Sequence, residues 1–313
     1  MISRRALPLL LASVLPARAD EPVRVGTLRF GSVAWELDVM RRHELVRGFT
    51  LQTVEFATGP ASQVALQAGN VDLVLQDWLW VSRQRAAGAK WTMSPVPAAL
   101  GAMMAPQGSS IRGIADLKGK RLGVAGGPLD KSWLLLRLFA RQTAGMDLDA
   151  AVEKVFGPPP LVAEQLRAGR LDAMLTYWPF AARAEAEGLQ TVLNMADVLA
   201  GLSVPRDMPM LGFVFAEDWA ARNRAALTAF LAASQAARTV LQQSDAEWDL
   251  IAPLTGARDA AELLRLRDWY RRGFPGALDR PAADKLFALF AEVGGADLVG
   301  PSKTLTPGTF WQA

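Results

Sequence analysis

The sequence contains no cysteine and a single histidine among its 313 residues. Without cysteine there are no disulfides, no thiol catalysis, no cysteine-ligated zinc and no lipid-bearing cysteine behind a signal sequence. The lone histidine, His43, stands among Arg41, Arg42 and Glu44, a charged stretch typical of a solvated helix face. One histidine does not make a transition-metal cluster. We therefore expect no metal and no cofactor.

The chain also lacks an apolar run of the roughly 18 residues that a membrane span needs. The ten-residue run Ala6–Leu15 follows Arg4 and Arg5 and precedes an Ala17-Arg18-Ala19 cleavage pattern, which predicts a signal peptide over residues 1–19. Without the arginines of that segment, the remaining basic residues only equal the 31 acidic ones. The pI of about 9.4 is therefore no argument for nucleic-acid binding. We expect a periplasmic protein.

What the chain does contain is an internal repeat. Phe56–Gly88 falls on Phe156–Gly188 when it is shifted by 100 residues, and eleven of the 33 positions are identical. Each copy predicts a helix that begins at its proline, a terminal glycine, a buried apolar strand and a second helix. The identical pairs are Phe56/Phe156, Pro60/Pro160, Leu66/Leu166, Ala68/Ala168, Gly69/Gly169, Asp72/Asp172, Leu75/Leu175, Trp78/Trp178, Arg83/Arg183, Ala86/Ala186 and Gly88/Gly188.

The repeat extends upstream, where Arg24-Val25-Gly26 is echoed by Arg121-Leu122-Gly123 with one gap. We therefore predict an α/β protein with two lobes of similar design, two hinge crossings and a ligand cleft between them. Lobe 1 is expected at residues 20–104 and 210–313, with the C-terminal helices packed on it. Lobe 2 is expected at residues 105–209.

Several aromatic residues fall at strand ends or helix starts on the predicted cleft side. Such rings stack on flat or apolar ligands or enclose a quaternary ammonium. The alternative is that tryptophans recur as core residues of a duplicated fold. The candidate cleft aromatics are Trp35, Trp78, Trp133, Tyr177 and Trp178.

Polar candidates stand at the predicted helix entrances. The glycine-rich turn Gly126–Ser132, with Gly127 and Ser132 as its binding candidates, offers free N–H groups to an anion, or Asp130 occupies those groups as an N-cap. Thr58 begins the equivalent helix in lobe 1. Gln76 and Asp77 end a strand at the cleft edge, where Asp77 either contacts the ligand or caps the next helix.

Three segments, Gly123–Arg137, Asn70–Trp78 and Val155–Leu161, resemble signatures of ABC-importer substrate-binding proteins of the nitrate/sulfonate/taurine group, which includes thiamine-precursor binders. The similarity covers about residues 22 to 290. It implies a type 2 periplasmic-binding fold, with an anionic head group held at Gly126–Ser132. This chain differs in carrying Asp130 where sulfonate binders usually show small hydroxyl residues.

The sequence thus favours a non-catalytic periplasmic receptor that delivers a small organic molecule to an ABC permease. The alternative is a periplasmic accessory or sensor protein built on the same fold. An enzyme is the third hypothesis. The related pyrimidine synthase relies on histidines and a cysteine that this chain lacks.

Overall fold

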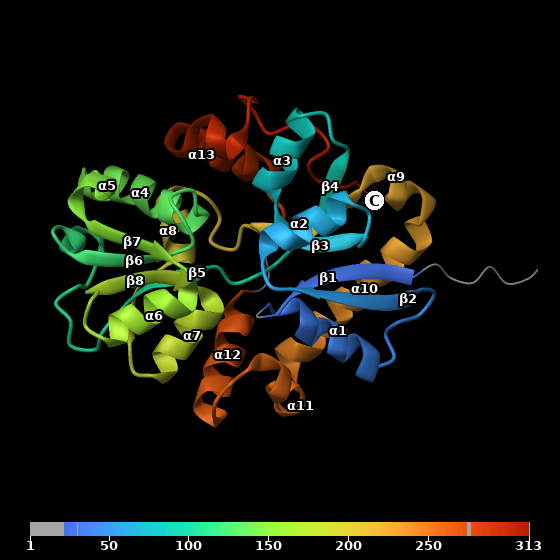
Figure 1. Cartoon of the computed structure of the whole chain (residues 1–313), viewed down its shortest axis with the longest axis horizontal. Helices are drawn as coiled ribbons and strands as arrows, with labels where there is room; N and C mark the ends of the chain where they lie inside the picture. The colour runs from blue at the N-terminus through green and yellow to red at the C-terminus, as the bar shows by residue number, and fades with distance from the viewer. Residues whose placement is uncertain (1–21, 30, 274–276, 313) are drawn as a thin grey trace, which may run out of the picture.

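The computed structural model describes residues 22–29, 31–273 and 277–312, so the predicted signal peptide lies outside the described residues. Two five-stranded sheets form the centres of two lobes that lie side by side (Figure 1). The first sheet has the strand order β2-β1-β3-β10-β4 and the second β7-β6-β8-β5-β9. The strands are β1 (Pro22–Leu28), β2 (Thr50–Phe56), β3 (Leu73–Asp77), β4 (Trp91–Val96), β5 (Gly101–Ala105), β6 (Arg121–Ala125), β7 (Glu153–Gly157), β8 (Ala173–Tyr177), β9 (Gln190–Asn194) and β10 (Leu211–Ala216).

The two sheets follow one plan. In each, three strands run parallel (β2, β1 and β3; β7, β6 and β8), and an antiparallel strand, β10 or β5, separates them from a fifth strand at the edge. The predicted α/β fold with two lobes is confirmed. The prediction that β4 is an edge strand is also confirmed, since Pro95 cannot donate a ladder hydrogen bond.

The first crossing between the lobes lies earlier than expected. β5 pairs with β8 and β9 in the second sheet, so the chain leaves the first sheet after β4 and crosses at residues 97–100. The predicted boundary at residues 104/105 had left this strand in lobe 1. The reason is that β5 is apolar on both faces, and such a pattern does not reveal which sheet a strand joins. The return crossing lies between Gly201 and Leu211.

Helices cover both faces of the two sheets (Figure 1). In this view α3, α4, α8 and α13 lie above the sheets, and α1, α6, α7, α11 and α12 lie below. The helices are α1 (Val33–Arg42), α2 (Gly59–Gln67), α3 (Trp78–Ala86), the 3-10 turn η1 (Ile114–Leu117), α4 (Lys131–Ala144), α5 (Leu148–Ala151), α6 (Pro159–Arg167), α7 (Trp178–Ala186), α8 (Met195–Gly201), α9 (Glu217–Arg222), α10 (Arg224–Gln243), α11 (Asp245–Thr255), α12 (Ala260–Arg272) and α13 (Arg280–Val299).

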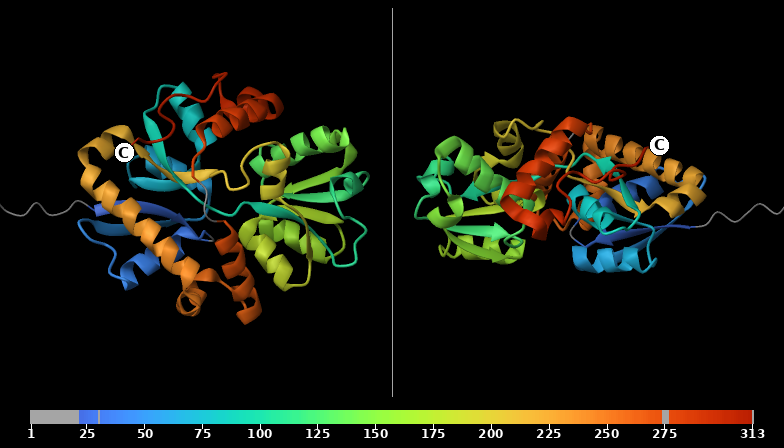
Figure 2. Two further views of the ribbon diagram at one scale, coloured as in Figure 1. Left: turned by 180° about the vertical axis from the view of Figure 1, so that it is seen from behind. Right: turned by 90° about the horizontal axis from the view of Figure 1, so that it is seen from above.

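The C-terminal helices do not pack on lobe 1 alone, and that prediction was wrong for two of them. α12 packs along α7 of the second lobe, and α13 contacts both α3 and α4, so it spans the junction of the lobes (Figure 2, right). At the end of α12, a Cβ on Gly273 would lie 2.1 Å from the backbone nitrogen of Ala99 in the first crossing. The two lobes therefore share helices as well as crossings.

The duplicated Asp72 and Asp172 have the same structural task. Asp172 accepts hydrogen bonds from the backbone N–H, Nε and Nη2 of Arg121 at 2.8, 3.2 and 2.8 Å. Asp72 accepts the equivalent three from Arg24 at 2.8, 3.0 and 2.6 Å. In each lobe this pair ties β1 or β6 to the residue directly before the neighbouring parallel strand, β3 or β8, which explains why both residues recur in the repeat.

We expect Asp172→Asn to lower the free energy of unfolding by about 1 kcal/mol at neutral pH, since the ion pair is partly exposed. The hydrogen bonds from Arg121 hold the pKa of Asp172 below its usual value. Because the folded-state pKa is depressed, this stabilisation is present above the unfolded value of about 3.9 and is lost as the pH falls through the folded value. Urea unfolding at several pH values tests this: a difference between variant and wild type that stays constant down to pH 3 would contradict it.

Candidate functional site

The carboxyl end of β3 and the start of α2 form the lobe 1 corner of the site. Gln76 and Asp77 are both 8% exposed. Asp77 caps α3, because its Oδ1 accepts a hydrogen bond from the backbone N–H of Trp80 at 2.9 Å. Thr58 is exposed and caps α2 by accepting from Ala61 N at 3.3 Å. Both capping roles leave further oxygen lone pairs available.

The loop after β6 and the end of β8 form the lobe 2 corner. Asp130 caps α4, with Oδ1 accepting from the backbone N–H of Trp133 at 3.2 Å, and Oδ2 accepting from the Tyr177 hydroxyl at 3.1 Å. Of the two interpretations of Gly126–Ser132, the structure therefore favours capping by Asp130. Gly127 and Ser132 lie half-buried beside this carboxylate.

One ion pair joins the two corners. Lys131 Nζ lies 2.9 Å from Asp77 Oδ2, which links the first turn of α4 in lobe 2 to the end of β3 in lobe 1. Lys131 was not predicted as a site residue. The sequence feature that could have identified it is its position directly after the N-cap. From there a long side chain reaches past the start of the helix.

An aromatic cluster also joins the lobes. The rings of Trp35 in lobe 1 and Trp178 in lobe 2 meet edge to face, with centroids 5.8 Å apart. Trp248 and Tyr270 of the C-terminal helices pack on the same rings. All four are at most 9% exposed. Trp35 and Trp178 thus meet at the junction of the lobes, where both rings are buried.

Two other predicted cleft aromatics lie in the core. Trp78 is 0% exposed and packs on Phe290 of α13 and on Phe310, and Trp133 is 1% exposed and packs on Phe156. The assignment of these two tryptophans to the cleft wall is therefore corrected, because their rings turn into the lobes.

The sequence pattern gave no indication of a buried ionic cluster beside Trp178. Glu36 Oε2 accepts from Arg238 Nη1 at 3.1 Å and from the Ser234 hydroxyl at 3.3 Å, and Oε1 accepts from the Tyr270 hydroxyl at 3.2 Å. Burial raises the pKa of Glu36. Glu36 and Arg238 are 202 residues apart in the chain, so no local motif reveals the pair. A small pocket of about 20 Å³ is lined by Glu36, Trp178 and Tyr270.

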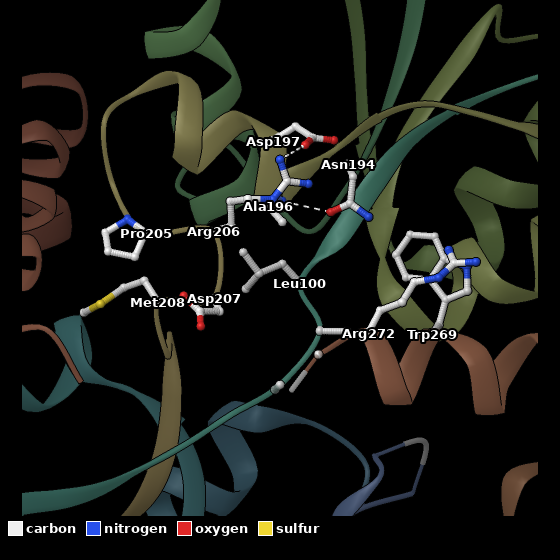
Figure 3. Close-up of a pocket in the computed structure, with 13 residues that line it drawn as sticks. Leu100, Asn194, Ala196, Asp197, Pro205, Arg206, Asp207, Met208, Trp269 and Arg272 are labelled. Atoms are coloured by element: carbon white, nitrogen blue, oxygen red, sulfur yellow. Dashed lines mark hydrogen bonds and ion pairs between the residues drawn. The ribbon is translucent and has the colours of Figure 1, made fainter. Parts of the chain in front are cut away.

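A larger pocket, of about 640 Å³, lies at the hinge (Figure 3). Residues of both crossings, including Leu100 and Met208, line it together with Trp269 at the end of α12. Of the two arginines that line it, Arg206 forms an ion pair with Asp197. None of the predicted site residues lines this pocket, so it is separate from the corners described above.

Over residues 22–29, 31–273 and 277–312, no group of three or more histidine, cysteine or acidic residues is arranged to hold a metal ion. Within the same ranges no helix combines the length and the apolar character of a membrane span.

Two α/β lobes, crossings between them and facing strand ends define the class: the chain has a type 2 periplasmic-binding fold. A family model described as the NMT1-like family matches residues 85–254, more than half of the sequence, and the chain belongs to that family. The suspected resemblance to sulfonate- and nitrate-type substrate-binding proteins is confirmed. The fold is the one found in solved periplasmic binding proteins.

Solved structures agree on the fold. The periplasmic aliphatic sulphonate binding protein SsuA from Escherichia coli is 21% identical, with a TM-score of 0.74 over 93% of this chain and 92% of that chain. The alkanesulfonate-binding protein SsuA from Xanthomonas axonopodis pv. citri, bound to MOPS, is 20% identical, with a TM-score of 0.71 over 95% and 100%. The periplasmic nitrate-binding protein NrtA from Synechocystis is 12% identical, with a TM-score of 0.58 over 83% and 74%. No curated protein matches the sequence.

Proposed function

We propose that the protein is the solute-binding component of an ABC importer and captures a small organic molecule between its lobes. The observation that carries this proposal is the pairing of the two strand-end corners, with Asp77 of lobe 1 and Lys131 of lobe 2 only 2.9 Å apart. In open α/β sheets ligands bind beyond the carboxyl ends of the strands. Here two such sites face one another, joined by crossings about which the lobes hinge.

The ligand contacts are assigned to side chains at these corners. In lobe 1 they are Thr58, Gln76 and Asp77, and in lobe 2 the loop from Gly127 to Ser132 with Tyr177. Tyr177 is 36% exposed at the end of β8, so its ring is available to stack on a flat or apolar group. Trp35 and Trp178 form the floor behind them.

The fold relatives support the wider role. SsuA of Escherichia coli is a periplasmic sulphonate binding protein, and NrtA is a periplasmic nitrate-binding protein. By analogy, the chain is exported by its predicted signal peptide, works in the periplasm and hands its ligand to an inner-membrane ABC permease. We place the lobe boundaries at the crossings, residues 97–100 and 202–210, with α12 and α13 shared.

The proposal is tested by a thermal-shift screen of the protein from Asp20 onward, with tryptophan fluorescence as a second readout. The panel contains sulfonates, nitrate, pyrimidines, aromatic acids and quaternary amines. A true ligand at a hundredfold excess over Kd stabilises the folded state by about 2.7 kcal/mol. A panel without any hit on the folded protein would contradict the receptor role and favour the accessory role.

Two variants distinguish a ligand site at the corners from one in the hinge pocket. Removing the Tyr177 ring by Tyr177→Ala should weaken binding of any hit by at least about tenfold, or 1.4 kcal/mol. Arg206→Ala is the control, since Arg206 lines only the hinge pocket and forms a surface ion pair. The opposite pattern, with Arg206→Ala weakening binding and Tyr177→Ala not, would move the site to the hinge.

A further inference from the structure

The start of α4 is where the cleft would receive an anion, because free backbone N–H groups and the positive end of the helix dipole are found there. This position at the turn Gly126–Ser132, here called the seat, already contains a carboxylate. Asp130 accepts the backbone N–H of Trp133 at 3.2 Å and the hydroxyl of Tyr177 at 3.1 Å. Two donors at this helix start, a backbone N–H and the phenol, are therefore already taken by a side chain of the protein itself.

Two side chains also lie close to the backbone of this turn. Gly126 has a φ of +101°, and a Cβ built on it would lie 2.8 Å from Tyr177 Oη and 3.1 Å from Asp130 Oδ2. The phenol and the carboxylate therefore lie close to the backbone of the turn, where the head group of a sulfonate or sulfate would approach it.

The nearest cation does not offset this charge for an incoming ligand. Lys131 Nζ is held 2.9 Å from Asp77 Oδ2 across the cleft. Two carboxylates and one ammonium leave the corner with a net negative charge, which repels an anion and attracts a donor group. Burial also removes solvent from the Asp130 carboxylate and so raises its pKa, and a hydrogen bond from a ligand N–H would compensate for the lost solvation.

We propose that Asp130 sets the charge class of the ligand: the receptor takes a neutral or cationic small molecule that donates a hydrogen bond at this seat, and it excludes sulfonates and similar acids. The inference rests on the proposed receptor function. It separates this chain from the sulphonate binding proteins that share its fold.

The test replaces Asp130 by serine, which still caps a helix but vacates the seat and frees the Tyr177 hydroxyl. Ethanesulfonate is titrated by calorimetry into wild type, Asp130→Ser and Asp130→Asn. We expect Asp130→Ser to bind ethanesulfonate at least about tenfold more tightly than wild type. Asp130→Asn should fall between the two, because the amide removes the charge and keeps the bulk.

The control is Asp259→Asn, the same change at the N-cap of α12, where Asp259 accepts from Glu262 N at 2.8 Å. It should leave the affinity for ethanesulfonate unchanged. The inference is overturned if wild type binds ethanesulfonate as tightly as Asp130→Ser does, or if the folded Asp130→Ser protein gains no affinity. Failure of the receptor function looks different: no compound of the panel, anions included, would then bind wild type, whatever the variants do with ethanesulfonate.

Discussion

Replacing Arg238 by methionine should lower the free energy of unfolding by about 3–5 kcal/mol, because it leaves the carboxylate of Glu36 buried without its cation. The side chains of Arg238 and Glu36 are 5% and 6% exposed, and their closest nitrogen and oxygen atoms lie 3.1 Å apart. The Ser234 and Tyr270 hydroxyls remain as hydrogen-bond donors, but neither carries a charge. Urea unfolding at pH 7 measures the loss.

The loss of stability caused by Arg238→Met should become smaller as the pH falls. Burial already raises the pKa of Glu36, and removing Arg238 raises it further. A folded-state pKa above the unfolded value of about 4.3 means that the stability is greatest below that value and is lost as the pH rises through the folded one. The deficit of Arg238→Met should therefore shrink on acidification and be complete at neutral pH.

Two further variants show whether the loss of stability comes from the buried charge of Glu36. Arg141→Met breaks the exposed pair with Glu292, whose side chains are both 57% exposed, and should cost less than about 1 kcal/mol. The double variant Glu36→Gln/Arg238→Met removes both charges and should be more stable than Arg238→Met alone. Equal losses for Arg238→Met and Arg141→Met would show that the buried pair contributes no more than a surface pair.

The repeat made most of the fold predictable. A duplicated strand with helices on both sides indicates a parallel sheet, and the paired Asp72 and Asp172 mark the same loop in each lobe. The antiparallel strand β5 and the bridging positions of α12 and α13 were missed. They have no counterpart in the repeat, and their places depend on contacts between residues far apart in the chain.

The tryptophans show why site residues were harder to predict than strands. Trp78 and Trp178 hold the same position in the repeat, each as the first residue of a helix. Trp78 is covered by Phe290 of α13, whereas Trp178 meets Trp35 across the lobes. The two rings differ in the aromatic residue that packs against them, which in each case comes from a distant part of the chain. Local patterning therefore identified the strand ends correctly but not the side to which each ring turns.

Trp178→Ala should change the distance between the lobes as well as the free energy of unfolding. The Trp178 ring contacts Trp35 of lobe 1 at 5.8 Å and Tyr270 of α12 at 6.2 Å, and its backbone N–H donates to Leu100 O of the first crossing at 2.8 Å. Truncation removes the ring contacts and keeps the backbone bond. We expect a loss of about 3–5 kcal/mol in the free energy of unfolding, together with a wider and longer distribution of distances between the lobes.

Trp133→Ala is the matched control for this experiment. Trp133 is also a buried tryptophan in the first turn of a lobe 2 helix, but its ring partner, Phe156, belongs to the same lobe. Since the chain has no native cysteine, spin labels on Gln52→Cys and Glu153→Cys report the distance between the outer strands β2 and β7 without background. Trp133→Ala should cost about as much stability and leave this distance unchanged. If both variants give the wild-type distribution, the Trp35–Trp178 contact does not hold the lobes together. The closing force then lies in the Asp77–Lys131 pair and the shared helices.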